Sequence, residues 1–125
     1  MDFMTAVSSV LSKYVGFQGR ARRSEYWWWM LAYFILLLVA NVLDRIIDPG
    51  PPGLIIHFGM IYDLAVLAVF LPTLAVTVRR LHDTNRSGFW IFIGLVPIVG
   101  WILLLVWYCT KGTSGANTYG PDPAA

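Results

Sequence analysis

The chain has 125 residues, of which 58% are hydrophobic, 15% aromatic and only 13% charged. A soluble domain is about 45–50% apolar and about 25% charged, so a soluble fold of this size could not cover so much apolar surface. Intrinsic disorder is excluded by the same figures, because it needs low hydrophobicity and high net charge. The net charge of +2 does not indicate a nucleic-acid partner. The composition therefore predicts a single membrane domain, residues 1–125.

Residues 1–25 predict a short amphipathic helix followed by a basic linker. Apolar residues recur at helical spacing over 3–15, Asp2 is placed to cap the helix, and Gly16 to end it. The helix is too short and too polar to span a membrane. It suits the headgroup boundary, or a position against the protein's own membrane domain, and the two are compatible. No cleavable signal peptide is expected, because charged residues interrupt the first 25 positions.

Two apolar segments, 26–43 and 54–78, predict the first two membrane spans. The first begins with Tyr26 and three tryptophans, which match an interfacial aromatic belt. Residues 48–53, DPGPPG, predict a tight turn between the two spans. Pro72 is expected to kink the second helix near Ala68, because proline lacks the N–H that would bond to that carbonyl.

Residues 89–109 form a third apolar stretch, after a basic loop at 79–88 and before a polar tail at 110–125. Gly94, Pro97 and Gly100 interrupt its middle. The stretch is either one kinked span or a re-entrant pair of half-helices, since two full spans would need about 40 residues. We favour three spans, which gives an all-α membrane protein with an additional N-terminal interfacial helix.

The distribution of lysine and arginine predicts the topology. With three spans, seven of the nine Lys and Arg residues fall on one side, in the N-terminal segment and the loop 79–88. The positive-inside rule places that side, and so the N-terminus, in the cytoplasm. A third span would put the tail outside, whereas a re-entrant hairpin would return it to the cytoplasm.

Arginines on the predicted cytoplasmic face are candidates for binding lipid headgroups or other anions. They fall in two clusters: Arg20, Arg22 and Arg23, and Arg79, Arg80 and Arg86. One interpretation is a topology signal that also attracts anionic lipids. The other is a defined anion site where the clusters meet, because the guanidinium group can hold phosphate through two hydrogen bonds.

Ionisable residues outside these clusters give weaker signals. His82 and Asp83 could form an acid–base pair, but we favour pairing of Asp83 with a neighbouring arginine, with His82 at the interface. Asp63, within or just beneath the apolar part of the second span, would cost about 2.5–3.5 kcal/mol as a charged group in hydrocarbon. It either pairs with Arg45 or marks an ion path together with His57. The single cysteine, Cys109, excludes an internal disulfide, and neither a metal site nor a cofactor is expected.

Three polar motifs together resemble the domain-of-unknown-function 805 family of small bacterial inner-membrane proteins. They are GFQGRARRSEYWWW (16–29), RRLHDTNRSGFW (79–90) and NTYGPDP (117–123). The resemblance implies a multi-pass protein of the bacterial plasma membrane and gives importance, but no known reaction, to the matching positions. These are Gly19, Arg20, Arg23, Tyr26, Trp27, Arg79, Arg80, Leu81, His82, Asp83, Trp90, Asn117, Tyr119, Gly120, Pro121, Asp122 and Pro123.

If the third motif cooperates with the other two, the tail must be cytoplasmic, with Asp122 available to the arginines. That arrangement requires a re-entrant third stretch and conflicts with three spans.

Three functions are compatible with the sequence, and we favour the first. The first is a non-enzymatic accessory or assembly component, with anionic lipid, a second copy of the chain or another membrane protein as its partner. The second is a small oligomeric transporter or channel that uses Asp63 and His57. The third is an enzyme that acts on lipid headgroups with His82 and Asp83.

Overall fold

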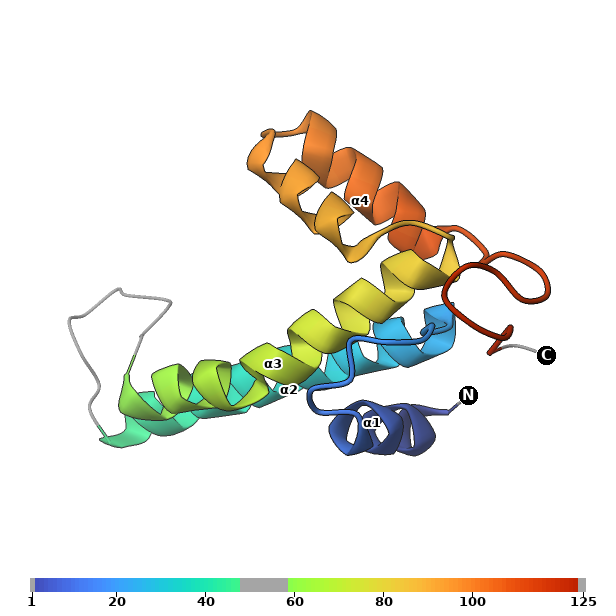
Figure 1. Cartoon of the computed structure of the whole chain (residues 1–125). Helices are drawn as coiled ribbons and strands as arrows, with labels where there is room; N and C mark the ends of the chain where they lie inside the picture. Colours follow the sequence, from blue (N-terminus) through green and yellow to red (C-terminus); the bar gives the residue numbers. More distant parts are fainter. Residues whose placement is uncertain (1, 48–58, 124–125) are drawn as a thin grey trace.

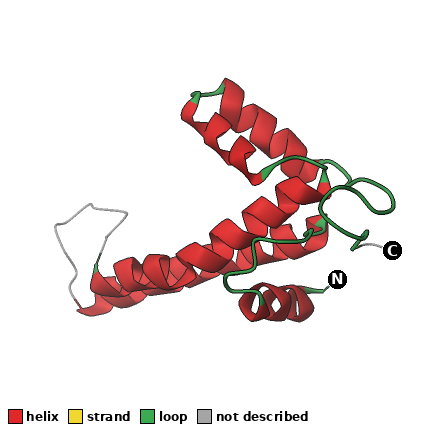
Figure 2. Ribbon diagram, viewed as in Figure 1, coloured by secondary structure: helices red, strands yellow, loops and turns green. Residues whose placement is uncertain are grey.

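The computed structural model describes residues 2–47 and 59–123, which form helices joined by loops without a β-strand (Figure 2). In chain order the elements are α1 (Phe3–Ser12), α2 (Arg23–Ile47), α3 (Met60–Asp83), the 3₁₀ helix η1 (Gly88–Leu95) and α4 (Val99–Cys109) (Figure 1). Within the described ranges, the predicted all-α fold is confirmed.

The two longest helices, α2 and α3, pack side by side and antiparallel (Figure 1). With 25 and 24 residues they are each about 36 Å long. Both are long and apolar enough to cross a membrane. Asp63 is the fourth residue of α3, and the predicted turn at 48–53 lies outside the described residues.

The boundary of α3 corrects the predicted basic loop at 79–88. Its first five residues, 79–83, form the last turn and a half of the helix. Arg80 and His82 lie in that final turn, where basic side chains suit the partial negative charge of a helix C-terminus. Helix α2 likewise begins at Arg23, inside the predicted linker.

Contacts at both ends hold α2 against α3. At one end the Asp44 carboxylate accepts hydrogen bonds from the backbone N–H groups of Ile61 and Tyr62, at 3.0 and 2.8 Å. Asp44 therefore caps α3 from the neighbouring helix. Nearer the other end, the Trp29 indole N–H donates to the Thr73 hydroxyl at 3.0 Å. A small buried core lies around Trp29 and includes Val10, Ala21, Tyr26 and Val76.

Helix α1 packs against both long helices. Asp2 caps it by accepting a hydrogen bond from the Thr5 backbone N–H at 2.8 Å, and hydrogen bonding to Thr5 lowers the pKa of Asp2. The cap prediction is confirmed, but the helix ends at Ser12 rather than at Gly16. Ala6 and Val10 are buried, whereas Met4 and Leu11 are exposed. One apolar face thus packs on the protein while another stays uncovered.

The third apolar stretch is a helical hairpin rather than one helix. Figure 1 shows η1 and α4 side by side, joined by a short turn and directed away from α3. The turn is sharp: Ile98 has a φ of 66°, and the Val99 N–H donates to the Pro97 carbonyl at 2.7 Å. Each arm is about 16 Å long, roughly half the thickness of a bilayer core. A third span is therefore not confirmed, and the stretch takes the doubled-back form.

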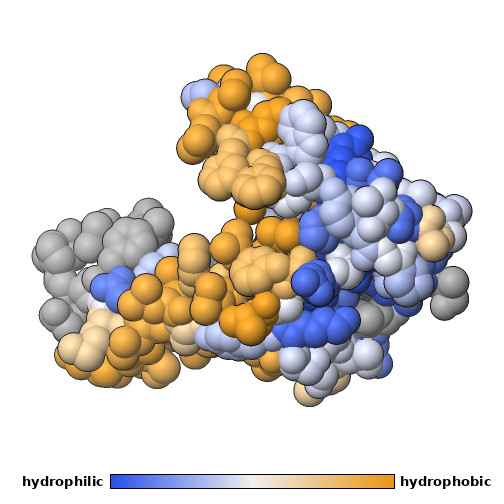
Figure 3. All heavy atoms as spheres, in the orientation of Figure 1, coloured by the Kyte–Doolittle hydropathy of each residue, from blue (hydrophilic) through white to orange (hydrophobic). Residues whose placement is uncertain are grey.

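Polar and apolar residues occupy different parts of the molecule. Figure 3 shows hydrophilic residues gathered where α2 begins, α3 ends and the C-terminal tail folds, and hydrophobic residues over the helical pair and the hairpin. We call the first region, built from residues 19–25, 79–86 and 109–122, the polar end. The hairpin both leaves and rejoins the bundle there, so the tail and the loop after α3 share one end of the molecule.

Candidate functional site

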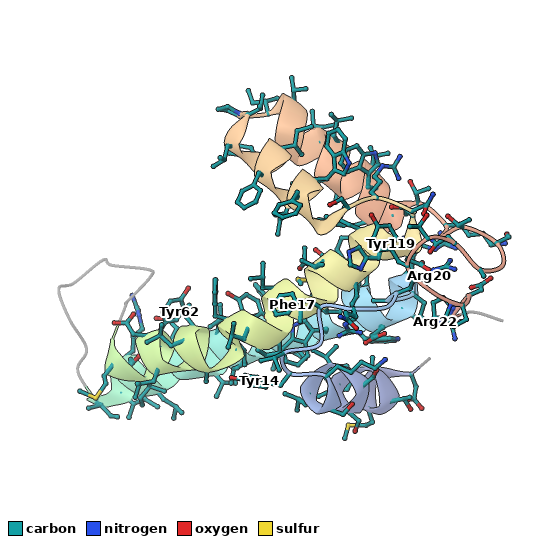
Figure 4. The ribbon with its side chains drawn as sticks, viewed as in Figure 1. Tyr14, Phe17, Arg20, Arg22, Tyr62 and Tyr119 are labelled. Atoms are coloured by element: carbon teal, nitrogen blue, oxygen red, sulfur yellow. The ribbon has the colours of Figure 1, made fainter. Side chains whose placement is uncertain are left out.

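The polar end brings together the three sequence motifs that the family resemblance singled out. Figure 4 shows Arg20, Arg22 and Tyr119 gathered at this end, while Tyr62 marks the opposite end of the helical pair. The tail lies against the other two motifs: Arg20 donates to the Gly115 carbonyl, and the Asn117 side chain donates to the His82 carbonyl. The arrangement follows from the hairpin, which leaves the bundle at the polar end and returns the chain to that same end.

Asp83 lies at the centre of the polar end and joins two of the motifs. One of its oxygens accepts from Arg20 Nε at 2.9 Å and the other from Arg80 Nη1 at 2.8 Å. All three side chains are at least 95% buried. Gly112 approaches so closely that a Cβ there would lie 2.0 Å from Asp83 Oδ2. Each oxygen of this buried carboxylate therefore pairs with an arginine, the kind of pairing that was favoured for Asp83 from the sequence.

Arg20 holds the C-terminal tail. Its guanidinium group donates to the carbonyl oxygens of Gly115 and Gly120, at 2.6 and 3.3 Å, and also to that of Thr113. A buried guanidinium group needs several acceptors to replace its hydration, and the tail carbonyls supply them. Arg20 thus positions the tail through buried hydrogen bonds, and its guanidinium group is not exposed at the surface.

Arg80 performs the same task for the hairpin. Its Nε and Nη2 atoms donate to the carbonyl oxygens of Tyr108 and Trp107, at 3.1 and 3.4 Å, and Nη2 also to that of Thr110. Trp27 adds an indole N–H to the Tyr108 carbonyl at 3.2 Å. The last carbonyls of a helix have no partner within it, so these donors cap α4 and fix the hairpin to the bundle.

Arg79 is fully buried and pairs with Glu25, which was not among the site residues expected from the sequence. Arg79 Nη1 lies 2.7 Å from Glu25 Oε1, which also accepts from the Ser9 hydroxyl at 3.0 Å. The contact joins α1, α2 and α3. The sequence did carry a signal, since Glu25 is a carboxylate directly before an apolar span and close to an arginine cluster.

His82 and Asp83 do not face each other as a catalytic pair. The His82 ring stacks on Tyr119 with centroids 4.0 Å apart, and its Nδ1 lies 2.9 Å from the Gly19 carbonyl oxygen. The His82 backbone carbonyl accepts from the Asn117 side chain at 3.0 Å. These contacts of His82 hold the tail and the linker against the end of α3.

The remaining arginines of the two clusters behave differently. Arg86 lies over the Trp107 ring, with its guanidinium carbon 4.5 Å from the centroid, which attaches the loop to α4. Arg22 and Arg23 line a cavity of about 380 Å³ at the polar end. The other lining residues are Ser24, Asp83, Lys111, Gly112 and Asp122. Of these, Ser24, Lys111 and Gly112 were not selected from the sequence. We call this space the cationic cavity.

Asp63 is exposed in the first turn of α3, far from the polar end. The ion pairs among the described residues are Arg20–Asp83, Arg79–Glu25 and Arg80–Asp83, so none joins Asp63 to Arg45. His57, its expected companion in an ion path, lies outside the described residues. Within residues 2–47 and 59–123, no group of three His, Cys, Asp or Glu side chains could hold a metal ion.

Comparison with known proteins identifies the family. Residues 14–121 match the family described as "Protein of unknown function (DUF805)". The chain belongs to this family. It is 50% identical over 115 residues to "Inner membrane protein YhaI" of Escherichia coli strain K12, covering 92% of each chain. It is 44% identical over 114 residues to "Inner membrane protein YhaH" of the same strain, covering 91% of this chain and 92% of that relative. No solved structure matches it.

These similarities bear on two predictions. The family resemblance read from the three motifs is confirmed, and so is the prediction of a membrane protein. The names of the relatives place those proteins in the inner membrane.

Proposed function

We propose that the chain is a non-enzymatic component of the bacterial inner membrane whose polar end faces the cytoplasm and binds anionic lipid headgroups. Helices α2 and α3 would cross the bilayer, and the hairpin of η1 and α4 would enter it from the cytoplasmic side and return. The charge distribution supports this orientation: the two arginine clusters and Lys111 belong to the polar end, whereas Arg45 lies near the opposite end of α2.

The cationic cavity is the observation that carries the proposal. Arg20, Arg79 and Arg80, three of the predicted lipid-binding residues, are buried in ion pairs and cannot reach a headgroup. Arg22, Arg23 and Lys111 instead line an accessible space, and among the described residues none of them takes part in an ion pair. The proposed lipid-binding role therefore moves from the buried arginines to the residues lining the cavity.

Lipid retention by the purified full-length chain tests the proposal. The protein in detergent would be titrated with phosphatidylglycerol or phosphatidylcholine, and the bound lipids counted by native mass spectrometry. We expect a preference for phosphatidylglycerol that falls in the Arg22→Gln/Lys111→Gln variant. Lys13→Gln, which removes an exposed cation outside the cavity, is the matched control. Equal retention of the two lipids by the wild-type chain would refute the proposal.

A further inference from the structure

We infer that one glycerophospholipid binds lengthwise on α2, with its phosphate in the cationic cavity and an acyl chain in the apolar groove below it. The inference rests on the proposed function, because it names the ligand and the binding mode of the same face. It is drawn from two neighbouring hollows that share a wall at Ser24.

The cavity has the chemistry of a phosphate site. Three cations line it, and the first turn of α2 begins in it at Arg23 and Ser24. The backbone N–H groups of a helix's first turn have no partner inside the helix and carry its partial positive charge. The Ser24 hydroxyl oxygen is buried and has no hydrogen-bond partner among the described residues. It is a further polar group that a phosphate oxygen could satisfy.

The carboxylates in the wall of the cavity do not cancel its charge. Asp83 is neutralised by two buried arginines that lie outside the cavity lining. Asp122 accepts a hydrogen bond from the Gly115 backbone N–H at 3.1 Å. Set against Arg22, Arg23 and Lys111, Asp122 leaves a net positive charge. The site therefore favours an anion.

The adjoining groove distinguishes a lipid from a free anion. It has a volume of about 230 Å³ and is lined by Ser24, Trp27, Trp28 and Leu31, which share one face of α2. Leu31 lies about 10 Å along the helix from Ser24, on the side that leads away from the polar end. The two tryptophans and Leu31 remain 37–44% exposed, so the groove is open to an acyl chain.

Along this face of α2 the charged cavity is followed by the apolar groove, just as the phosphate of a phospholipid is followed by its acyl chains. Inorganic phosphate would use only the cavity, and a hydrocarbon without a headgroup only the groove. A ligand that has both parts gains from both, and the gains in affinity multiply.

The test compares three probes on the full-length chain in detergent: phosphatidylglycerol, sn-glycerol phosphate and inorganic phosphate. Two variants separate the hollows. Arg22→Gln/Lys111→Gln removes cavity charge, and Leu31→Trp fills the groove. Leu43→Trp is the matched control, because Leu43 is an equally exposed leucine near the other end of α2 (43% against 44%). Circular dichroism and the thermal midpoint would establish that each variant is folded.

We expect phosphatidylglycerol to bind wild type at least about tenfold more tightly than either soluble phosphate, and the cavity variant to lose about tenfold of that affinity. Leu31→Trp should weaken only the lipid, and Leu43→Trp neither class of probe. Equal affinity for lipid and inorganic phosphate, or normal lipid binding by Leu31→Trp, would overturn the lipid assignment, while the binding of anions in the cationic cavity stood. If the lipid-retention experiment showed no preference of the wild-type chain for phosphatidylglycerol over phosphatidylcholine, the proposed function would fail as well.

Discussion

The hydroxyl group of Tyr14, just beyond α1, donates a hydrogen bond to the backbone carbonyl of Ala68 in the middle of α3. That carbonyl is the one that Pro72, four residues later, cannot bond, because proline has no backbone N–H. The break predicted from Pro72 therefore serves as an attachment point for the N-terminal segment. The proline removes a bond inside one helix, and a tyrosine outside that helix replaces it.

Removing this hydroxyl should loosen the N-terminal segment. Tyr14→Phe is expected to lower the free energy of unfolding in detergent by about 1–2 kcal/mol, because it leaves the Ala68 carbonyl without its donor. In a Pro72→Ala background the helix can supply an N–H for that carbonyl, so the same change should cost clearly less. Equal costs in the two backgrounds, measured by denaturant titration, would show that the hydroxyl does not serve the carbonyl freed by Pro72.

Among the described carboxylates, we expect substitution of Asp83 to lower the free energy of unfolding most. Asp83→Asn leaves two buried guanidinium groups without their counter-ion, and breaking a buried pair typically costs about 3–5 kcal/mol. Asp63→Asn, at an exposed position outside the described ion pairs, should change the free energy of unfolding by less than about 0.5 kcal/mol. Thermal unfolding of both variants in the same detergent would measure the difference, and similar midpoints would contradict the central role of Asp83.

Much of this fold could be predicted because its signals depend on residues that are close together in the chain. The apolar runs predicted the two long helices, and Asp2 predicted the cap of α1, which depends on a residue three positions away. The glycines and the proline at 94–100 indicated that the third stretch could be interrupted. They could not decide between a kink and a hairpin, because that choice depends on how η1 and α4 pack on each other.

The candidate site was harder to predict, since its pairings are long-range. The arginines could be selected from the sequence as candidates, but burial decides their role. Arg20 and Arg80 are enclosed by the tail and by the end of α4. Lys111 and Ser24 become candidate binding residues only because they line the cavity. A charge count alone cannot separate a guanidinium group that organises the fold from one that faces the surroundings.

Asp44 should be required for the far end of the helical pair. It accepts two backbone N–H groups at the start of α3, and Gly59 approaches it so closely that a Cβ there would lie 2.5 Å from its carboxyl carbon. Asp44→Ala is therefore expected to cost about 1–2 kcal/mol, as for the loss of a helix cap. Asp63→Ala, in the first turn of the same helix, is the control. Equal effects in urea or SDS titrations would argue against capping.

The hairpin depends on Gly100, where the backbones of α4 and η1 approach each other. A Cβ at Gly100 would lie 1.8 Å from the Ile93 carbonyl oxygen, and a backbone atom cannot simply rotate away. Gly100→Ala should cost about 1–3 kcal/mol, as overpacking typically does. At Gly94 the corresponding contact is the Leu104 side chain at 3.3 Å, so Gly94→Ala should be tolerated. A thermal midpoint of Gly100→Ala equal to that of Gly94→Ala would count against the hairpin.

The hairpin also predicts that the C-terminus and the loop after α3 are on the same side of the membrane. Cys109 and Gly88 end the two arms at the polar end, so a reporter fused to the tail should give the same location as one inserted at Asn85, an exposed loop residue. If the polar end is cytoplasmic, a fluorescent-protein fusion at the C-terminus would be bright and an alkaline phosphatase fusion inactive. The same pair of fusions to a chain truncated after Ile47 should give the reverse result, because that truncation ends after one span. An active phosphatase on the full-length tail, together with a cytoplasmic reporter at Asn85, would establish the three-span topology and separate the tail from Arg20 and Asp83.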